Sequence, residues 1–353
     1  MVVFWNGERP IGHRLKAELG GRSLELEDMA PELLDAPDLP PAPGAPSASV
    51  VICTRDRPEE LARCLASLPR QSRPPREIIV VDNASRDGRT REAALAAGVT
   101  YVREDRPGLD IARNAGARAA TCDIVAYTDD DVVLHPRWLE RLVAAFDAPE
   151  VMAVTGLVLP AELASEAQLQ FETFWSFGQG YRRKDFDAAL FSSYTRVPFP
   201  AWDVGAGASM AFRRALFAAI GLFDERLDVG RAGCSGDSEF WYRALAAGHT
   251  CRYEPSAVAF HYHRREMDGL KSQIFHYMRG HAAALLVQNE RTRLRSNLKQ
   301  ALYVMPRWLA ARAWRRLHGG AKPRDRFLDQ EIAGYLSGLW FYLRQPRARD
   351  GTP

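Results

Sequence analysis

Short apolar runs alternate with segments of helical pattern from residue 48 to about residue 130. The runs at 49–53 (SVVIC) and 77–81 (EIIVV) are rich in β-branched residues, as buried strands are. The whole pattern predicts strands at 49–53, 77–81, 99–102 and 124–128, and helices at 58–68, 90–97 and 109–120. Continuous apolar strands between helices indicate a parallel sheet that is covered on both faces. We therefore expect an α/β fold with a mostly parallel sheet flanked by helices.

The pattern changes at about residue 267, where strands give way to helices. A long helical pattern covers 267–289, and a further apolar segment lies at 332–343. Between them, apolar residues recur at spacings of three and four: Leu298, Leu302, Met305, Leu309, Ala313 and Leu317. Pro306 either kinks this stretch or begins a new helix. We expect residues 267–353 to form a helical C-terminal region.

Residues 1–47 follow neither pattern. They open with a short apolar piece, for which we expect a small hairpin or strand packed on the main domain. Six prolines then fall within 16 residues: Pro31, Pro37, Pro40, Pro41, Pro43 and Pro46. This spacing excludes a helix or a central strand and indicates an extended linker. The predicted organisation is an N-terminal extension and linker (1–47), an α/β domain (48–266) and a helical, basic region (267–353).

Length and composition agree with this organisation. A chain of 353 residues suggests two domains at ~150 residues each. Its 46% apolar and 26% charged residues exclude a disordered or collagen-like protein. No apolar run of roughly 18 residues predicts a transmembrane helix, and the first residues meet charge and proline too early for a signal peptide. Five cysteines without a CxxC pair argue against disulfides and structural zinc. We expect a cytoplasmic protein with reduced, mostly buried thiols.

Basic residues gather at the C-terminal end. The net charge of +3 is too small to imply a nucleic-acid partner, and we expect none. Residues 291–353, however, hold 14 basic and 4 acidic residues, so their net charge is +10 and that of the rest is −7. Trp308 and Trp314 lie among these arginines, a composition that suits a membrane interface. An anionic membrane surface is thus one predicted partner, at the inner face of the cell membrane. A solvated helical face, packing on the main domain and a dimer contact are the alternatives.

Polar residues follow the ends of the predicted strands. Thr54 and Arg55 come after the first strand, Asp82 after the second, and residues 129–131 (DDD) after the fourth. In open α/β sheets, ligands bind at the carboxyl ends of the strands. The first strand–helix turn has no GxGxxG motif, and the chain has no P-loop motif, so a dinucleotide site of the usual kind is disfavoured.

Three adjacent aspartates repel one another unless a cation sits among them. Oxygen ligands select a hard ion, so Mg²⁺ or Mn²⁺ is the predicted cofactor, and such an ion can hold a diphosphate. The alternative is a solvated acidic turn. The position of the triplet after an apolar strand favours the metal.

Four further segments in the second half carry candidate chemistry. Residues 205–208 (GAGA) predict either a close approach of the backbone to a ligand or a tight turn. Residues 236–239 (GDSE) resemble a helix start, where acidic residues complement the helix dipole. Residues 178–202 are rich in aromatic residues, arginine and glycine, which predicts a loop over the site that acts as a lid or is a plain surface insertion. His261 and His263 are assigned to opposite faces of one strand, so that only His261 faces the site.

Six segments together resemble the family-2 glycosyltransferases, in order and over about residues 48–265. They read SVVICTRDRPEELARCLASL, EIIVVDNAS, GLDIARNAGARAA, DIVAYTDDDVVLHPRWLERL, VGAGASMAFRRALFAAIGLFDERL and GDSEFWYRALAAG. The order of the motifs is more specific than any one of them. The resemblance implies the GT-A fold and transfer of a sugar from a nucleotide-sugar donor with inversion at the anomeric carbon.

The resemblance also implies roles for individual residues. The donor nucleotide is assigned to Thr54, Arg55, Asp82, Arg113, Asp129 and Asp130. The metal is assigned to Asp129, Asp131 and His261, the first two being the ends of a DxD motif. Asp237 matches the general base. Gly207, Trp202 and Glu239 are candidates for contact with the sugar or acceptor. Arg55 and Asp56 depart from the family, which usually has an aromatic residue and an asparagine there, so the nucleobase stays open.

The sequence thus predicts an inverting, metal-dependent glycosyltransferase that acts in synthesis of a cell-surface glycan, polysaccharide or glycolipid. The donor is a UDP-, GDP- or dTDP-sugar, and the acceptor is a glycan, a lipid-linked molecule or a small molecule. A non-catalytic nucleotide-sugar-binding protein and a nucleotidyltransferase are the alternatives. The poor match of residues 54–60 (TRDRPEE) to a glycine-rich basic loop disfavours the second.

Overall fold

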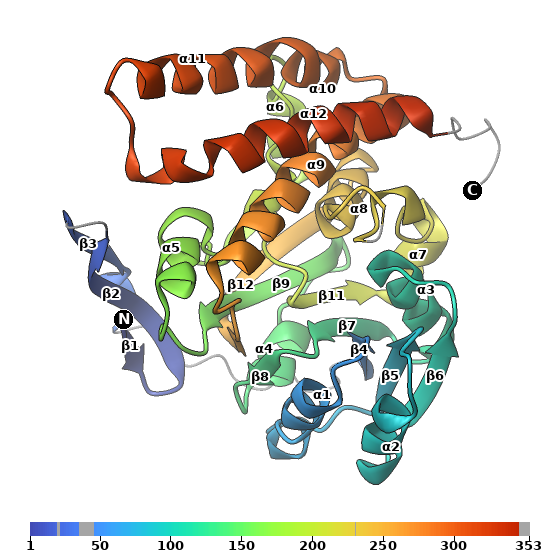
Figure 1. The fold of residues 1–353 in the computed structure, drawn as a ribbon. Coiled ribbons are helices and arrows are strands. Elements are labelled where there is room, and N and C mark those ends of the chain that lie inside the picture. The colour runs from blue at the N-terminus through green and yellow to red at the C-terminus, as the bar shows by residue number, and fades with distance from the viewer. Residues whose placement is uncertain (20–21, 35–45, 230, 346–353) are drawn as a thin grey trace.

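A mixed sheet of nine strands forms the centre of the molecule (Figure 1). The computed structural model describes residues 1–19, 22–34, 46–229 and 231–345. The strands are β4 (Ala48–Thr54), β5 (Glu77–Asn83), β6 (Thr100–Glu104), β7 (Ile124–Asp129), β8 (Val132–Leu134), β9 (Val151–Pro160), β10 (Lys184–Phe186), β11 (Ser209–Arg213) and β12 (Thr250–His261). The four strands predicted from the sequence are β4 to β7.

The sheet is parallel at the end formed by β7, β4, β5 and β6, and mixed at the other end. Its order is β10-β12-β9-β11-β7-β4-β5-β6, and β8 pairs with β12. β7, β4, β5 and β6 are parallel neighbours, as predicted. β11 lies antiparallel between β7 and β9, while β9 and β12 are parallel. The carboxyl ends of β4, β5 and β7 therefore meet at one edge of the sheet.

Helices cover both faces of the sheet, because successive strand residues point to opposite sides. Val50 and Ile52 of β4 belong to one core, with α1 (Pro58–Leu65), α2 (Arg89–Ala96) and α4 (Trp138–Ala144). Val51 and Cys53 belong to the other core, with α3 (Leu109–Ala119), α7 (Arg214–Ile220) and α8 (Gly236–Ala246). Helices α1 to α3 agree with the predicted ones. The five cysteines are free, and all except the half-buried Cys234 are buried.

The N-terminal segment forms an antiparallel sheet of β1 (Val2–Asn6), β2 (Arg9–Leu19) and β3 (Arg22–Met29). It contains more structure than the single hairpin or strand that we expected. Trp5 stacks on His135 with ring centroids 5.4 Å apart, and His13 hydrogen-bonds Tyr181 at 2.9 Å, so the sheet packs on the main domain as predicted. The predicted linker lies mostly outside the described residues. Of its prolines, Pro31 begins a 3-10 turn.

The C-terminal region is helical, as predicted. It consists of α9 (Met267–Thr292), α10 (Arg295–Lys299), a π-helix at Gln300–Val304, α11 (Met305–Leu317), a 3-10 turn at Pro323–Phe327 and α12 (Leu328–Arg344). Pro306 lies in the first turn of α11, where proline is tolerated, so it begins this helix. In Figure 1, α11 and α12 form an outer layer over α9. A Cβ on Gly334 or Gly338 of α12 would come within 2.2 Å of a carbonyl oxygen of α9, so glycine permits this close contact.

None of the described helices is both long enough and apolar enough to span a membrane.

The segment 178–202 is more regular than a loop. It contains β10, which pairs antiparallel with β12 at the end of the sheet, α6 (Ala188–Ser193), and the start of a 3-10 turn at Ala201–Val204. The prediction of an irregular loop was therefore wrong for this part. Pairing with β12 fixes Lys184–Phe186, although the sequence of the segment shows little periodicity.

Candidate active site

One large cavity, of about 1240 Å³, reaches the carboxyl ends of β4, β5, β7 and β12. One wall carries the polar strand ends that the sequence singled out. The opposite wall comes from α5 (Glu166–Trp175), α9, the π-helix and α11. A cavity at this edge is where α/β sheets bind ligands.

The turn after β4 contributes the first polar group of the cavity. Thr54 and Arg55, which the sequence assigns to the nucleotide, both line it. The Thr54 hydroxyl donates a 2.7 Å hydrogen bond to Asp130 Oδ2. Arg57 was not among the predicted residues, yet its guanidinium lies 3.2 Å from Asp130 and 3.1 Å from Asp131. Asp130 therefore faces this turn. Burial, with the nearby Asp131, raises the pKa of Asp130 to about 7.

At the end of β5, the cavity is lined by Asn83 and not by the predicted Asp82. Asp82 is buried and accepts hydrogen bonds from Ser85 N, Tyr101 Oη and Arg103 Nη1, at 3.0, 2.7 and 2.9 Å. Adjacent residues of a strand point to opposite sides, so only one of the pair can face the cavity. Sequence reasoning missed Asn83, and the nucleotide contact assigned to Asp82 stays a prediction.

Asp129, Asp131 and His261 come together at the ends of β7 and β12. One ligand atom from each lies within 4.8 Å of the others. His261 Nε2 is 3.2 Å from Asp131 Oδ1, an oxygen that is buried and has no hydrogen bond of good geometry. Burial and the nearby Asp131 raise the pKa of Asp129. Burial opposes ionisation of Asp131 too, but His261 and Arg57 outweigh it and lower that pKa to about 2. Two carboxylates and one imidazole are a donor set that fits Mn²⁺ or Mg²⁺.

His261 and His263 do not lie on opposite sides, so that prediction was wrong. Their Nδ1 atoms are 2.9 Å apart, because residues two apart in an extended chain project to the same side. Only His261 lines the cavity. His263 lies behind it, with Nε2 at 3.4 Å from Glu172 Oε2. This chain of contacts fixes the orientation of the His261 ring.

Asp237 lies in the first turn of α8 and lines the cavity beside Arg113 and Gly207. A Cβ on Gly207 would come within 2.6 Å of Arg113 Nη2 and 2.7 Å of Asp237 Oδ2. The backbone approach predicted for residues 205–208 is therefore an approach to these two side chains. Arg113 is buried and bonds Asp110 at 3.0 Å. The site thus has a carboxylate next to a fixed cation.

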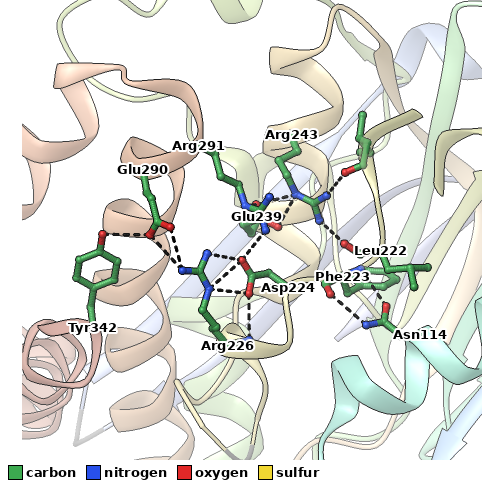
Figure 2. A network of polar contacts seen from close by, with 11 residues as sticks. Asn114, Leu222, Phe223, Asp224, Arg226, Glu239, Arg243, Glu290, Arg291 and Tyr342 are labelled. Atoms are coloured by element: carbon green, nitrogen blue, oxygen red, sulfur yellow. Dashed lines mark hydrogen bonds and ion pairs between the residues drawn. The ribbon is translucent and has the colours of Figure 1, made fainter. Parts of the chain in front are cut away.

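Glu239 does not reach the cavity, which contradicts its assignment to the sugar or acceptor. It is fully buried and bonds Arg243 at 2.7 Å and Arg291 at 3.3 Å (Figure 2). Figure 2 shows that this network continues through Asp224 and Arg226. It joins α8 to α9, so Glu239 ties the C-terminal helices to the sheet domain.

Trp202 and Gly207, the other candidates for sugar or acceptor contact, do line the cavity. The Trp202 ring lies 5.2 Å from that of His281 on α9. Sequence reasoning missed the whole wall that α9 and α11 build, including Tyr277, Gln288 and Trp308. Its only signal in the sequence was the tryptophans among the arginines near Pro306.

An α/β sheet with this cavity at its carboxyl ends, and a DxD segment there, defines the class of GT-A fold proteins. A solved structure of the same kind, the mannosyltransferase PcManGT from Pyrobaculum calidifontis in complex with GDP-Man and Mn²⁺, aligns with 88% of this chain and 92% of its own at a TM-score of 0.55. Its 23% identity supports likeness of fold alone. Residues 49–220 match the model described as Glycosyl transferase family 2. The matched region, residues 49–220, belongs to that family.

The sequence alignments with two relatives extend beyond residues 49–220. The pre-mycofactocin glycosyltransferase of Mycobacterium tuberculosis is 28% identical over 270 residues, which cover 74% of this chain and 53% of that protein. Glycosyltransferase AglE of Haloferax volcanii is 26% identical over 236 residues, covering 65% and 71%. The chain therefore spans only about half the length of the first of these relatives.

Proposed function

We propose that the protein is an inverting, metal-dependent glycosyltransferase that moves a sugar from a nucleotide-sugar donor to an acceptor hydroxyl. One observation carries the proposal. The three candidate metal ligands Asp129, Asp131 and His261 share one cavity with the carboxylate of Asp237 and the cation of Arg113. A diphosphate needs the ion that the three candidate ligands would hold, and activation of a hydroxyl needs the carboxylate of Asp237.

Asp129, Asp131 and His261 would hold the ion, Mn²⁺ or Mg²⁺. When bound, the ion neutralises charge on the diphosphate and makes it a better leaving group. PcManGT was solved with GDP-Man and Mn²⁺, which supports a donor and metal of this type. Thr54, Arg55 and Arg113 line the same part of the cavity and would bind the nucleotide.

Asp237 would act as the general base. As the acceptor oxygen forms its bond to the anomeric carbon, the bond from that carbon to the diphosphate oxygen breaks. The electron pair leaves with the nucleoside diphosphate, and the acceptor proton passes to the Asp237 carboxylate. Attack from the face opposite the leaving group inverts the anomeric centre. Arg113, held by Asp110, keeps a cation next to this carboxylate.

A panel of nucleotide sugars with Mn²⁺ tests the proposal. We expect one donor to release nucleoside diphosphate in a reaction that EDTA stops. Pyrophosphate as the product would favour the alternative of a nucleotidyltransferase. Donor binding without any turnover would favour the non-catalytic alternative, although Asp129, Asp131 and Asp237 all face the cavity.

The pathway and location are part of the proposal as well. Relatives named for O-antigen biosynthesis and for transfer to a glucosyl-dolichyl phosphate support an acceptor in cell-surface glycan or glycolipid synthesis. Exposed apolar residues on α11 and α12 support contact with an anionic membrane: Trp314, Leu317, Leu336, Trp340 and Leu343. Arg307 and Arg315 are exposed on the same α11 helix. Apolar and cationic side chains on one helix layer suit the membrane interface.

A further inference from the structure

The wall of the cavity built by α9, the π-helix and α11 has chemistry of its own. We propose that this wall, outside the region that matches the family, is the acceptor subsite, and that it takes a sugar ring or a similar neutral polyol. The proposal rests on the glycosyltransferase function above and names its acceptor class.

The size of the cavity leaves room for a second ligand. Sites for one small molecule usually measure about 300–1,000 Å³. At about 1240 Å³ the cavity exceeds this range. The wall with the candidate metal ligands carries the strand ends. The other wall has residues of α9 and begins beyond Asp237 and Gly207. A donor and an acceptor can therefore meet within it.

Two amides on this wall have no partner among the described residues. Gln288 of α9 is only 6% exposed and lines the cavity, yet its side chain makes no hydrogen bond there. Gln300 also lines the cavity, and its Oε1 is buried without a hydrogen bond. A buried amide oxygen that lacks a partner costs about 1–3 kcal/mol, so Oε1 of Gln300 calls for an explanation. Ligand hydroxyls, which both donate and accept, would satisfy these groups.

The backbone around Gln300 supports the same assignment. Gln300 begins the π-helix, a rare element that often occurs at functional sites. The buried Tyr335 of α12 donates its hydroxyl proton to the carbonyl oxygen of Ala301 at 2.5 Å, within this turn. The irregular turn is therefore stabilised from outside the cavity, while Gln300 stays on its inner surface.

Aromatic rings supply the apolar part of the wall. Tyr277 of α9 and Trp308 of α11 line the cavity, and Trp175 and Trp202 line it from outside this wall. Arg324 lies 4.9 Å from the Trp175 ring and 5.9 Å from the Trp308 ring, and its charge is paired with Glu331 at 2.9 Å. Flat rings next to neutral amides suit a ligand with apolar ring faces and hydroxyl edges.

The charge of the wall disfavours a cationic acceptor. Among the described residues that line the cavity, the carboxylates are Asp129, Asp130, Asp131 and Asp237, all on the metal side. The wall thus offers no anion to an amine. His281 is buried, which lowers its pKa to about 4, so it is neutral near pH 7 and adds no charge. A neutral, hydroxyl-bearing acceptor matches this environment.

The experiment uses the full chain with Mn²⁺, its active nucleotide sugar and a panel of 4-nitrophenyl α- and β-hexosides as acceptors. We expect sugar transfer to at least one hexoside, seen by mass spectrometry. Gln288→Leu and Gln300→Leu should each raise the acceptor KM about tenfold, since a lost hydrogen bond to a buried group costs about that factor. Trp308→Ala should raise the acceptor KM too, because the apolar surface of the ring is lost. Trp314→Ala is the matched control and should leave KM unchanged, because Trp314 is on the same helix but lies outside the cavity and is 64% exposed, against 39% for Trp308.

Donor binding, measured by calorimetry, separates the two levels of the proposal. It should be the same in all four variants and the wild type. If the wild type binds no nucleotide sugar, the glycosyltransferase function itself is overturned. If the donor binds normally but no hexoside accepts a sugar, only the acceptor assignment is overturned. Unchanged acceptor KM in the three wall variants would overturn it equally.

Discussion

At the residue scale, chemistry depends on which side chains face the cavity. Asp130 and Asp131 are neighbours in the chain, but Asp130 bonds Thr54 and Arg57, while Asp131 also meets His261. Asp237 and Glu239 are two residues apart on α8, and only Asp237 reaches the cavity. Substitutions at the members of such pairs therefore test ligand binding, catalysis and stability one at a time.

Asp131→Asn should weaken Mn²⁺ binding by about 100-fold or more. Loss of a residue that only supports a metal ligand typically costs 10–100-fold in affinity, and loss of a direct ligand should cost at least as much. Calorimetric titration with Mn²⁺ measures this. Asp130→Asn is the matched control, since Asp130 is not one of the three grouped ligands, and it should retain most of the affinity. Equal Mn²⁺ affinity in Asp131→Asn and the wild type would refute the metal site.

Asp237→Asn should lower kcat by about 100-fold or more, the usual contribution of a general base, because the amide cannot accept the acceptor proton. The affinity for the nucleotide sugar should change little, since in the proposed mechanism the diphosphate is held by the ion at Asp129 and Asp131. Steady-state kinetics and donor titration test the two halves. A variant with near wild-type kcat would place the base elsewhere.

Glu239→Gln should act on stability and not on chemistry. It leaves Arg243 without its buried counter-charge, and breaking such a pair costs about 3–5 kcal/mol. Urea unfolding measures the loss, while kcat per folded molecule should stay unchanged. Asp329→Asn removes an exposed ion pair with Arg316 and should alter stability little. A large fall in kcat of folded Glu239→Gln would return Glu239 to the site.

At the element scale, the C-terminal helices have two different sides. Their inner side closes the cavity through Gln288 of α9 and Trp308 of α11, and the network in Figure 2 fastens α9 to α8. Their outer side exposes Trp314 and Leu317, at 64% and 80%. Removal of the whole region would disturb both sides, so point substitutions on the outer side are the better probe of membrane contact.

Leu317→Glu should weaken binding to vesicles of phosphatidylcholine with 30% phosphatidylglycerol about tenfold, because it places a negative charge in an apolar, cationic surface. Raising salt to 0.5 M should weaken wild-type binding too, since charges are then screened within a few ångströms. Vesicle co-sedimentation measures both. Leu95→Glu, at a 56% exposed leucine of α2, is the control. Failure of the wild type to bind these vesicles at low salt would leave a structural or dimer role for this surface.

At the scale of the whole molecule, donor binding should couple to folding. The cavity takes residues from both the sheet domain and the C-terminal helices, so a ligand there binds only the folded chain. A nucleotide sugar at 100 times its Kd should stabilise the protein by about 2.7 kcal/mol, and EDTA should abolish the effect. A thermal-shift screen with Mn²⁺ would identify the cognate nucleotide. Equal shifts with and without EDTA would argue against a metal-dependent donor site.

The sequence by itself determined the strand and helix pattern of residues 48–130, the helical C-terminus and the position of the aspartate triplet. These features depend on local periodicity and on motifs within a few residues of one another. The order of the family-2 motifs also indicated Asp237, which the helix start alone did not.

Only the tertiary structure decided which neighbouring side chains face the cavity. Asn83 replaces Asp82 there, His263 supports His261, and Glu239 pairs with Arg291, which lies 52 residues further along the chain. The wall of α9 and α11 faces strand ends far away in sequence. Such contacts depend on how distant elements pack, and no local pattern records them, because a side chain's partners are chosen by the fold and not by its neighbours in the chain.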